Sequence, residues 1–173
     1  MRNITNSDKL ADFMRLFGRA ARSECRVYFT GGVTAVLMAW RDSTVDIALR
    51  FEPESDELYR ALPELKERLA INIELASPPD FIPEVPGWQE RSLFIKREGK
   101  ADFFHFDPYS QALAKIERGH DQDFPDVRSM LDSGLIERTK LSKLFLAIEP
   151  NLYRYPAIKP SAFRKAVELI VSE

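Results

Sequence analysis

The fold is decided by two neighbouring segments, Tyr28-Phe29-Thr30-Gly31-Gly32-Val33-Thr34-Ala35 and Arg41-Asp42-Ser43-Thr44-Val45-Asp46-Ile47-Ala48-Leu49. The apolar residues that precede the glycine pair predict a short buried strand, which the two glycines interrupt. Residues 33–40 carry no turn signal and are expected to form a helix. Residues 44–51 alternate between polar and apolar, which predicts a strand with Asp46 and Ala48 on its polar face.

The glycine pair and Asp46 each permit a functional and a purely structural interpretation. Glycine lets the backbone approach a ligand closely, and free N–H groups at the start of a helix bind phosphate well. A glycine pair is equally common in strand-to-helix turns that bind nothing. Asp46 could be an ordinary exposed residue at a sheet edge. Aspartate is depleted in strands, however, so its position between two apolar residues needs an explanation.

Composition excludes several classes of protein. The chain has 173 residues, 45% of them hydrophobic and 30% charged, which is typical of one globular domain. A net charge of −2 gives no overall attraction to nucleic acid or anionic membranes. One cysteine, Cys25, and two histidines exclude an internal disulfide and disfavour a structural zinc site. The first residues are polar and no apolar run reaches the ~18 residues of a membrane span, so a cytoplasmic protein is expected.

The rest of the chain predicts an α+β fold, with a mixed sheet flanked by helices. Residues 1–107 are expected to form the α+β core, and residues 108–173 a helical subdomain packed on it as a single compact unit. Residues 77–88 hold four prolines and are expected to be a long loop, anchored by Trp88. His105 and His120 are expected at the surface. The other expected elements are a helix starting at Asn6 or Ser7, a helix over 53–70, a strand over 71–75, a hairpin over 92–96 and 101–106, and helices over 108–118, 124–131, 139–148 and 161–171.

A glycine pair at a helix start, an aspartate on the next strand and Glu74 on the strand after it together resemble the nucleotidyltransferase superfamily that includes DNA polymerase β. Over almost the whole chain, the sequence is similar to the bacterial and archaeal family DUF6036, which has the nucleotidyltransferase fold and is distantly similar to toxins of abortive-infection systems. The segments that carry this resemblance are residues 28–37, 40–46, 74–83 and 114–119, with Asp123.

The resemblance implies a magnesium site. In the superfamily, two aspartates of an Asp-x-Asp strand and a carboxylate on a following strand hold Mg²⁺. Asp46 matches the first aspartate, and Glu74 is expected to be the further carboxylate, so both are candidate catalytic residues and metal ligands. Asp102, on the expected hairpin, is a second candidate for the third ligand. Ala48 stands where the second aspartate would be, and its methyl group cannot bind a metal.

The resemblance also implies a site for a nucleoside triphosphate. Lys115 and Arg118 lie three residues apart on one face of an expected helix and could reach phosphates, or could belong to a solvated face beside Glu117 and Asp121. Arg41 could contact phosphate or pair with a neighbouring aspartate. The residues expected to hold the nucleotide are Gly31, Gly32, Thr34, Arg41, Thr44, Lys115 and Arg118.

Two functions follow as expectations. An active protein would transfer a nucleoside monophosphate from an NTP to a hydroxyl group of an unknown acceptor, which could be RNA, a protein or a small molecule. A protein that has lost metal chemistry through Ala48 would be an inactive nucleotide-binding or interaction module, of the kind found in toxin–antitoxin systems. A homodimer or a partner protein is compatible with either function.

Overall fold

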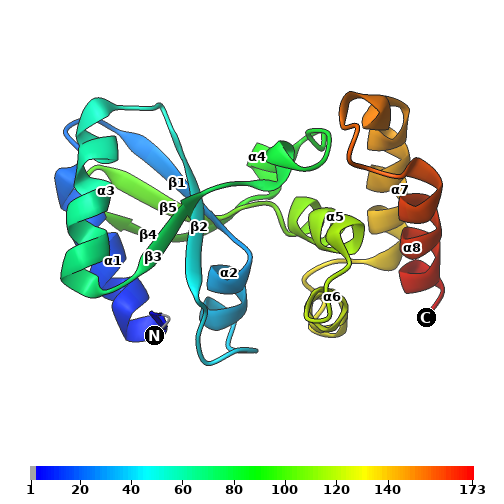
Figure 1. Cartoon of the computed structure of the whole chain (residues 1–173), viewed down its shortest axis with the longest axis horizontal. Helices are drawn as coiled ribbons and strands as arrows, with labels where there is room; N and C mark the ends of the chain where they lie inside the picture. The colour runs from blue at the N-terminus through cyan, green and yellow to red at the C-terminus, as the bar shows by residue number, and fades with distance from the viewer. Residues whose placement is uncertain (1–2) are drawn as a thin grey trace. The chain divides into compact units, whose positions relative to one another are not determined.

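The computed structural model describes residues 3–173 and divides the chain into two compact units (Figure 1). The first unit comprises Met1–Ser77 and Ser92–His105 and contains all the strands. The second comprises Pro78–Arg91 and Phe106–Glu173 and is helical. The predicted α+β class, with a mixed sheet, flanking helices and helices at the C-terminal end, is confirmed.

The sheet has five strands in the order β3-β2-β1-β5-β4. β1 pairs antiparallel with β2 and parallel with β5, whereas β2 pairs parallel with β3 and β4 pairs antiparallel with β5. β1 therefore lies in the middle of the sheet, with β2 on one side and β5 of the hairpin on the other. The bounds of the strands are β1 Cys25–Thr30, β2 Asp46–Glu52, β3 Asn72–Leu75, β4 Leu93–Glu98 and β5 Ala101–His105.

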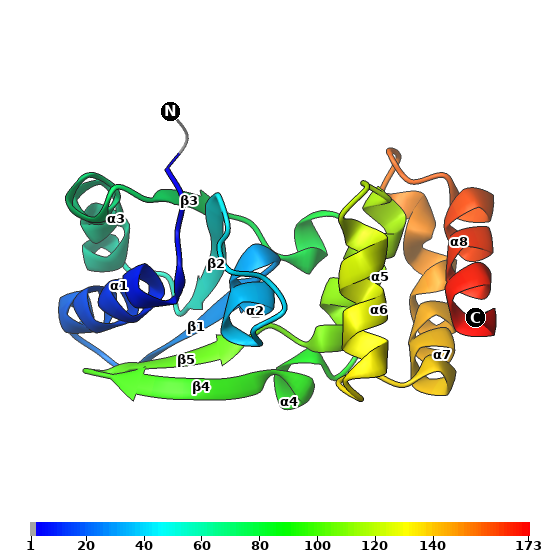
Figure 2. The ribbon, with the colours of Figure 1, turned by 90° about the horizontal axis from the view of Figure 1, so that it is seen from below.

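Two long amphipathic helices, α1 (Ser7–Ala20) and α3 (Asp56–Leu69), lie on one face of this sheet (Figure 2). Both begin at side-chain caps, because Asn6 accepts a hydrogen bond from the Lys9 amide and Ser55 accepts one from the Leu58 amide. Their apolar stripes pack on the inward residues of the strands. The buried cluster includes Phe13, Phe17, Val27, Phe29, Ile47, Leu49, Phe51, Leu62 and Phe103.

The helix that follows the glycine pair, α2 (Gly32–Leu37), is shorter than the predicted 33–40. It ends because Ala39 adopts a positive φ of 67°, a conformation that cannot continue a right-handed helix. Its buried face, which includes Val33 and Val36, completes the cluster under α1. The chain then returns directly into β2.

The helical unit contains five α-helices among the described residues, α4 Trp88–Arg91, α5 Pro108–Arg118, α6 Asp123–Asp132, α7 Arg138–Ile148 and α8 Pro160–Ser172. The unit also contains two 3₁₀ turns, η1 (Pro78–Asp80), which precedes α4, and η2 (Glu149–Arg154), which lies between α7 and α8. Residues 77–88 are expected as a loop; the structure has η1 within this segment, and α4 begins at its last residue. Residues 78–91 belong to the helical unit. α5 ends at Gly119 in the left-handed conformation, as predicted.

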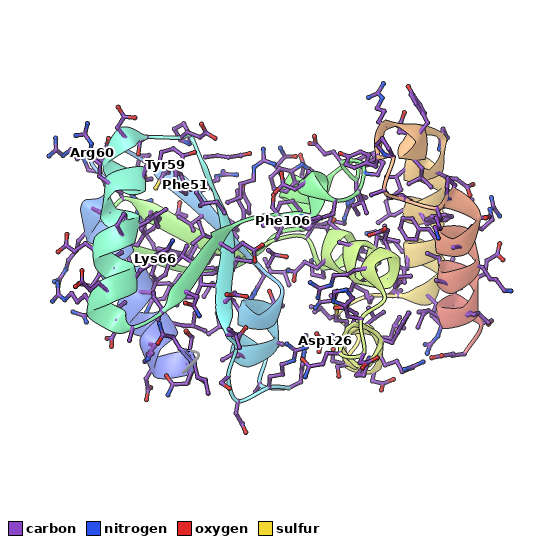
Figure 3. The ribbon with its side chains drawn as sticks, viewed as in Figure 1. Phe51, Tyr59, Arg60, Lys66, Phe106 and Asp126 are labelled. Carbon is purple, nitrogen blue, oxygen red and sulfur yellow. The ribbon has the colours of Figure 1, made fainter. Side chains whose placement is uncertain are left out.

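The start of α5 is fixed by a buried ion pair. Asp107 is fully buried, caps the helix by accepting from the Tyr109 and Ser110 amides, and binds Arg91 through both carboxylate oxygens at 3.1 and 2.8 Å. The Trp88 ring stacks on Phe106, which Figure 3 labels, with ring centroids 4.3 Å apart. The prediction that Trp88 anchors the proline-rich segment is confirmed.

One expectation about the hairpin is wrong. His105 was expected at the surface but is only 5% exposed, because it is the last residue of β5 and pairs with Phe29 on the core face of the sheet. Its Nδ1 forms a 2.9 Å hydrogen bond with the Thr34 hydroxyl of α2. Burial lowers the His105 pKa to about 4, so the ring is neutral near pH 7.

Candidate functional site at the end of the sheet

The two candidate catalytic carboxylates lie on one face of the sheet. Asp46 begins β2 and Glu74 is on β3, and the parallel register pairs Asp46 with Asn72 and Ala48 with Glu74. Asp46 and Glu74 are therefore diagonal neighbours, with Cα atoms roughly 8 Å apart from strand spacing and rise. Both are exposed, on the face opposite the one that α1 and α3 cover.

Ala48 lies in the middle of this face. Its Cα partner on one side is Glu74 of β3, and on the other side it is Thr30, the last residue of β1. Its side chain points the same way as that of Asp46, since the two are separated by one residue of a strand. An aspartate at position 48 would thus stand between the two carboxylates.

The two glycines have different structural roles. Gly31 has a φ of 68° and a ψ of −130°, a conformation that L-residues avoid, and a Cβ built there would meet nothing within 4 Å. Gly32 has an ordinary φ, but a Cβ there would collide with the Thr44 side chain. Chain geometry alone thus requires both glycines, and no protein atom lies within 4 Å of the position that a Cβ of Gly31 would occupy.

The other predicted nucleotide-binding residues of this unit lie around the same turn. Thr44 donates from its hydroxyl to the Asp46 carbonyl at 3.2 Å and pairs through its backbone with Thr5. Arg41 is partly buried in the connection between α2 and β2. Thr34 is 1% exposed and its hydroxyl is engaged by His105, so that side chain supports α2 from inside the unit.

Asp102 does not join Asp46 and Glu74. β5 runs parallel to β1, so Asp102 pairs with Arg26 at the start of β1, and Arg26 pairs in turn with Glu52 at the end of β2. Six residues separate this level from Asp46, which is about 20 Å along the strand. Asp102 also forms an ion pair with Arg97 at 3.2 Å. The topology of the hairpin, which the spacing of the sequence does not reveal, therefore removes this second candidate ligand.

Lys115 and Arg118 belong to the helical unit, where both bind carboxylates of α6. The Lys115 ammonium is buried and lies 2.9 Å from Asp126, which is labelled in Figure 3, and 3.8 Å from Asp123. Arg118 binds Asp123 through two hydrogen bonds of 2.8 and 2.6 Å. The solvated-face alternative for Lys115 is wrong, because this cation is an internal partner of α6.

The surroundings of Asp123 favour its charged form. Burial of Asp123 acts to raise its pKa, but hydrogen bonds from Arg118 and from the His120 amide, with the charges of Arg118 and Lys115, outweigh that effect and lower the pKa. Asp123 is thus held as a carboxylate at the junction of α5 and α6. The two cations, Lys115 and Arg118, thus balance the charges of the two carboxylates, Asp123 and Asp126.

Among residues 3–173 no group of three or more His, Cys, Asp or Glu side chains is arranged to hold a metal ion. The sheet end offers two carboxylates, Asp46 and Glu74. Mg²⁺ is commonly held by one or two carboxylates together with substrate phosphates and water, whereas two-metal chemistry needs more carboxylates than these. The donor set therefore fits one nucleotide-bound Mg²⁺ and does not fit a protein-held pair of ions.

Two polar residues of this face were not among the predicted site residues. Thr30 lies beside Ala48, and Asn72 lies beside Asp46 and donates through its amide to the Val45 carbonyl at 3.2 Å. The alternation of residues 26–30 places Thr30 on the polar face of its strand, which is the signal that would have identified it. Asn72 could have been found from the same alternation in residues 71–75.

Comparisons with known proteins agree with the fold. In the part of the chain that the structure describes, no helix is both long and apolar enough to cross a membrane. No curated protein and no solved structure matches the sequence. One family model, described as a nucleotidyltransferase of unknown function, matches residues 8–165. The chain therefore belongs to the DUF6036 family of nucleotidyltransferases.

Proposed function

We propose that this protein binds a nucleoside triphosphate with Mg²⁺ at the sheet end formed by β1, β2 and β3, and transfers the nucleoside monophosphate to a hydroxyl group. The observation that carries the proposal is the position of Asp46 and Glu74 as neighbours on one face, beside the turn at Gly31. Family membership supports the reaction class, and the geometry of the sheet end supports Asp46 and Glu74 as the residues that would perform it.

The carboxylates of Asp46 and Glu74 would hold Mg²⁺ together with the phosphates of the nucleotide. When bound, the ion neutralises phosphate charge and stabilises the pyrophosphate that leaves. Asp46 is placed for this role because it opens β2, where its side chain is exposed beside the Gly31 turn. Glu74 lies on the neighbouring strand, and its side chain leaves the same face of the sheet as that of Asp46.

The chain's own backbone and side chains would orient the substrates. The open space beside Gly31 admits a phosphate to within contact of the main chain. In the transfer, the acceptor oxygen forms a bond to the α-phosphorus as the bond to pyrophosphate breaks, and the hydroxyl proton passes to a carboxylate or to water. Exposure of this face leaves room for acceptors of different size, including RNA, a protein or a small molecule.

A second function is favoured by Ala48. Its methyl group lies between the two carboxylates, where the superfamily has a metal-binding aspartate. A protein with this site could retain the nucleotide and lose the transfer step. It would then act as a nucleotide-binding or interaction module, for which a toxin–antitoxin system is one setting.

A transfer assay separates the two functions. The purified chain is incubated with each α-³²P-labelled NTP, Mg²⁺, and cellular RNA, protein or metabolite fractions. We expect a labelled acceptor with the wild type and a loss of at least about 100-fold in Asp46→Asn and Glu74→Gln. Asp102→Asn is the matched control, because Asp102 is on the same face at the other end of the sheet. Nucleotide binding without transfer supports the second function, and transfer that survives in Asp46→Asn contradicts the proposed site.

A further inference from the structure

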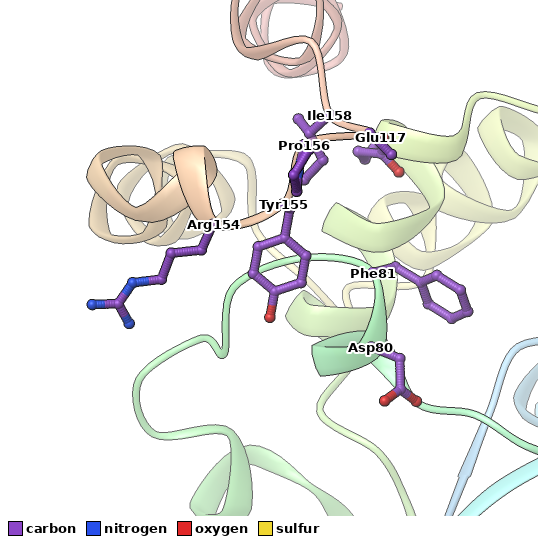
Figure 4. A pocket seen from close by; sticks show the side chains of 8 residues that line it. Asp80, Phe81, Glu117, Arg154, Tyr155, Pro156 and Ile158 are labelled. Atoms are coloured by element: carbon purple, nitrogen blue, oxygen red, sulfur yellow. The ribbon is translucent and has the colours of Figure 1, made fainter.

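The residues that line one small cavity all belong to the helical unit. Its volume is about 240 Å³, and it is lined by the η1 turn, by the last turn of α5 and by the loop that follows η2 (Figure 4). Pockets for drug-sized molecules span ~300–1,000 Å³, so this cavity suits a shorter ligand. The residues that line it include Asp80, Phe81, Glu117, Arg154, Tyr155 and Ile158.

The charge that faces this cavity is negative. Asp80 and Glu117 both line it. Arg154 lines it as well, but its guanidinium lies over the Tyr153 ring, 5.7 Å from the centroid, and donates to the Tyr153 hydroxyl at 3.2 Å. Figure 4 shows the Arg154 side chain pointing away from Glu117. The lining therefore carries two carboxylates and one guanidinium group, and that guanidinium group is engaged by Tyr153.

Glu117 is the polar group that most needs a partner. It is partly buried in the last turn of α5, where the helix carbonyls add further negative potential. Burial raises the pKa of its carboxyl group. A bound cation would compensate both the burial and the helix dipole.

The remaining walls are apolar and aromatic. The Tyr155 hydroxyl donates to the Pro79 carbonyl at 2.8 Å, which fixes the ring across the cavity and ties the loop after η2 to η1. Phe81 is 52% exposed and stands at the rim, while Ile158 is buried at the other side. Aromatic faces attract cations, and the aliphatic walls accommodate an alkyl chain.

From this arrangement we propose that the cavity binds a short organic cation, an alkylguanidinium or alkylammonium group, with its charge at Glu117 and its alkyl chain against Tyr155 and Ile158. Negative potential, aromatic faces, an aliphatic wall and small volume all select this chemistry over anions, nucleotides and neutral apolar compounds. The same group occurs in free amines and in arginine or lysine side chains of peptides.

The test uses the full-length chain and NMR titration of the backbone amides of Glu117 and Ala157. The probes are n-butylguanidine, a blocked Gly-Arg-Gly peptide, and n-butanol as the neutral analogue. Glu117→Gln keeps the shape of the side chain and removes its charge. Glu90→Gln, at an exposed position of α4 in the same unit, is the matched control. Circular dichroism confirms that each variant is folded.

We expect saturable shifts with butylguanidine, none with butanol at the same concentration, and affinity at least about 10-fold weaker in Glu117→Gln, as for the loss of a charge-assisted hydrogen bond. Glu90→Gln should bind like the wild type. Peptide binding as tight as that of butylguanidine would assign the site to a protein side chain, and exclusion of the peptide would assign it to a free amine. The proposal is overturned by the absence of saturable shifts with both cations at tens of millimolar, or by unchanged affinity in Glu117→Gln.

Discussion

Ala48 and Glu74 are direct partners in the parallel ladder between β2 and β3, so their side chains leave the same face of the sheet side by side. Asp46 is two residues before Ala48 on the same face. The missing superfamily aspartate would therefore have stood against Glu74 and next to Asp46. This relationship makes position 48 the most informative one for substitution.

Ala48→Asp should lower stability in the absence of metal. The new carboxylate faces Glu74 across the ladder, and like charges directly opposite each other cost up to about 1 kcal/mol, or ~2–4 °C in melting temperature for a chain of this size. Mg²⁺ should restore the loss by binding the three carboxylates. Ala48→Asn, which adds similar bulk without charge, is the control for melting with and without Mg²⁺. A lower melting temperature that Mg²⁺ does not restore would show that position 48 does not face a metal site.

Gly31→Ala should weaken nucleotide binding as well as stability. The φ of 68° costs an L-residue about 1–2 kcal/mol, although the added methyl group meets no protein atom. The methyl group instead occupies the space through which a phosphate would approach. Gly134→Ala is the matched control, since Gly134 also has a positive φ and open space around it. Urea unfolding should show similar losses in the two variants, and nucleotide titration should distinguish them. Equal nucleotide affinity in Gly31→Ala and Gly134→Ala would show that Gly31 does not belong to the nucleotide site.

His105 should make the protein less stable at acidic pH. Its folded pKa of about 4 is below the ordinary value, so the unfolded chain binds the proton more readily. Stability is complete above about pH 6.5 and falls as the pH drops toward 4, by at most about 3 kcal/mol for this group. His105→Gln should flatten the dependence of the unfolding free energy on pH over this window, whereas His120→Gln, at an exposed position, should not. An identical slope in His105→Gln and the wild type would contradict the buried neutral ring.

Arg118→Gln should destabilise the helical unit. It leaves the buried Asp123 carboxylate without its two-pronged partner, at a cost of about 1–3 kcal/mol. Because the folded pKa of Asp123 is lowered, this contribution is present above the unfolded pKa and is lost as the pH falls through the folded pKa. Arg128→Gln removes a pair with Glu173 that also has two hydrogen bonds but is exposed to solvent, so it should cost much less stability than Arg118→Gln. Urea unfolding at pH 7 compares the two variants, and equal losses would refute a buried role for Asp123.

Local signals were sufficient for most of the elements. Apolar periodicity placed the first helix, and the Asn6 cap and the Gly119 stop fixed helix ends because both act through adjacent backbone groups. Alternation placed Asp46 and Ala48 on one face, as the ladder confirms. The early end of α2 could not be predicted, because the positive φ of Ala39 is imposed by the return of the chain into β2 rather than by residue type.

The positions of Asp102, His105 and Lys115 depend on contacts between distant parts of the chain, which local sequence patterns do not predict. Asp102 was a reasonable carboxylate by spacing, but the parallel pairing of β5 with β1 carries it to the far end of the sheet. His105 is polar and belongs to the hairpin, but the pairing of β5 with β1 places it opposite Phe29, on the buried face of the sheet. Lys115 and Asp126 meet only because α5 and α6 fold back on each other, and residue spacing within one helix cannot show that contact.

Calorimetric titration of the chain with ATP, GTP, CTP and UTP, with and without Mg²⁺, tests the nucleotide site most directly. We predict that at least one nucleotide binds in a Mg²⁺-dependent manner, that Asp46→Asn weakens it at least about 10-fold, and that Asp102→Asn leaves it unchanged. Circular dichroism of both variants excludes unfolding as the cause. The absence of heat with all four nucleotides up to millimolar concentrations, or equal affinity in Asp46→Asn and the wild type, would contradict a nucleotide site at this end of the sheet.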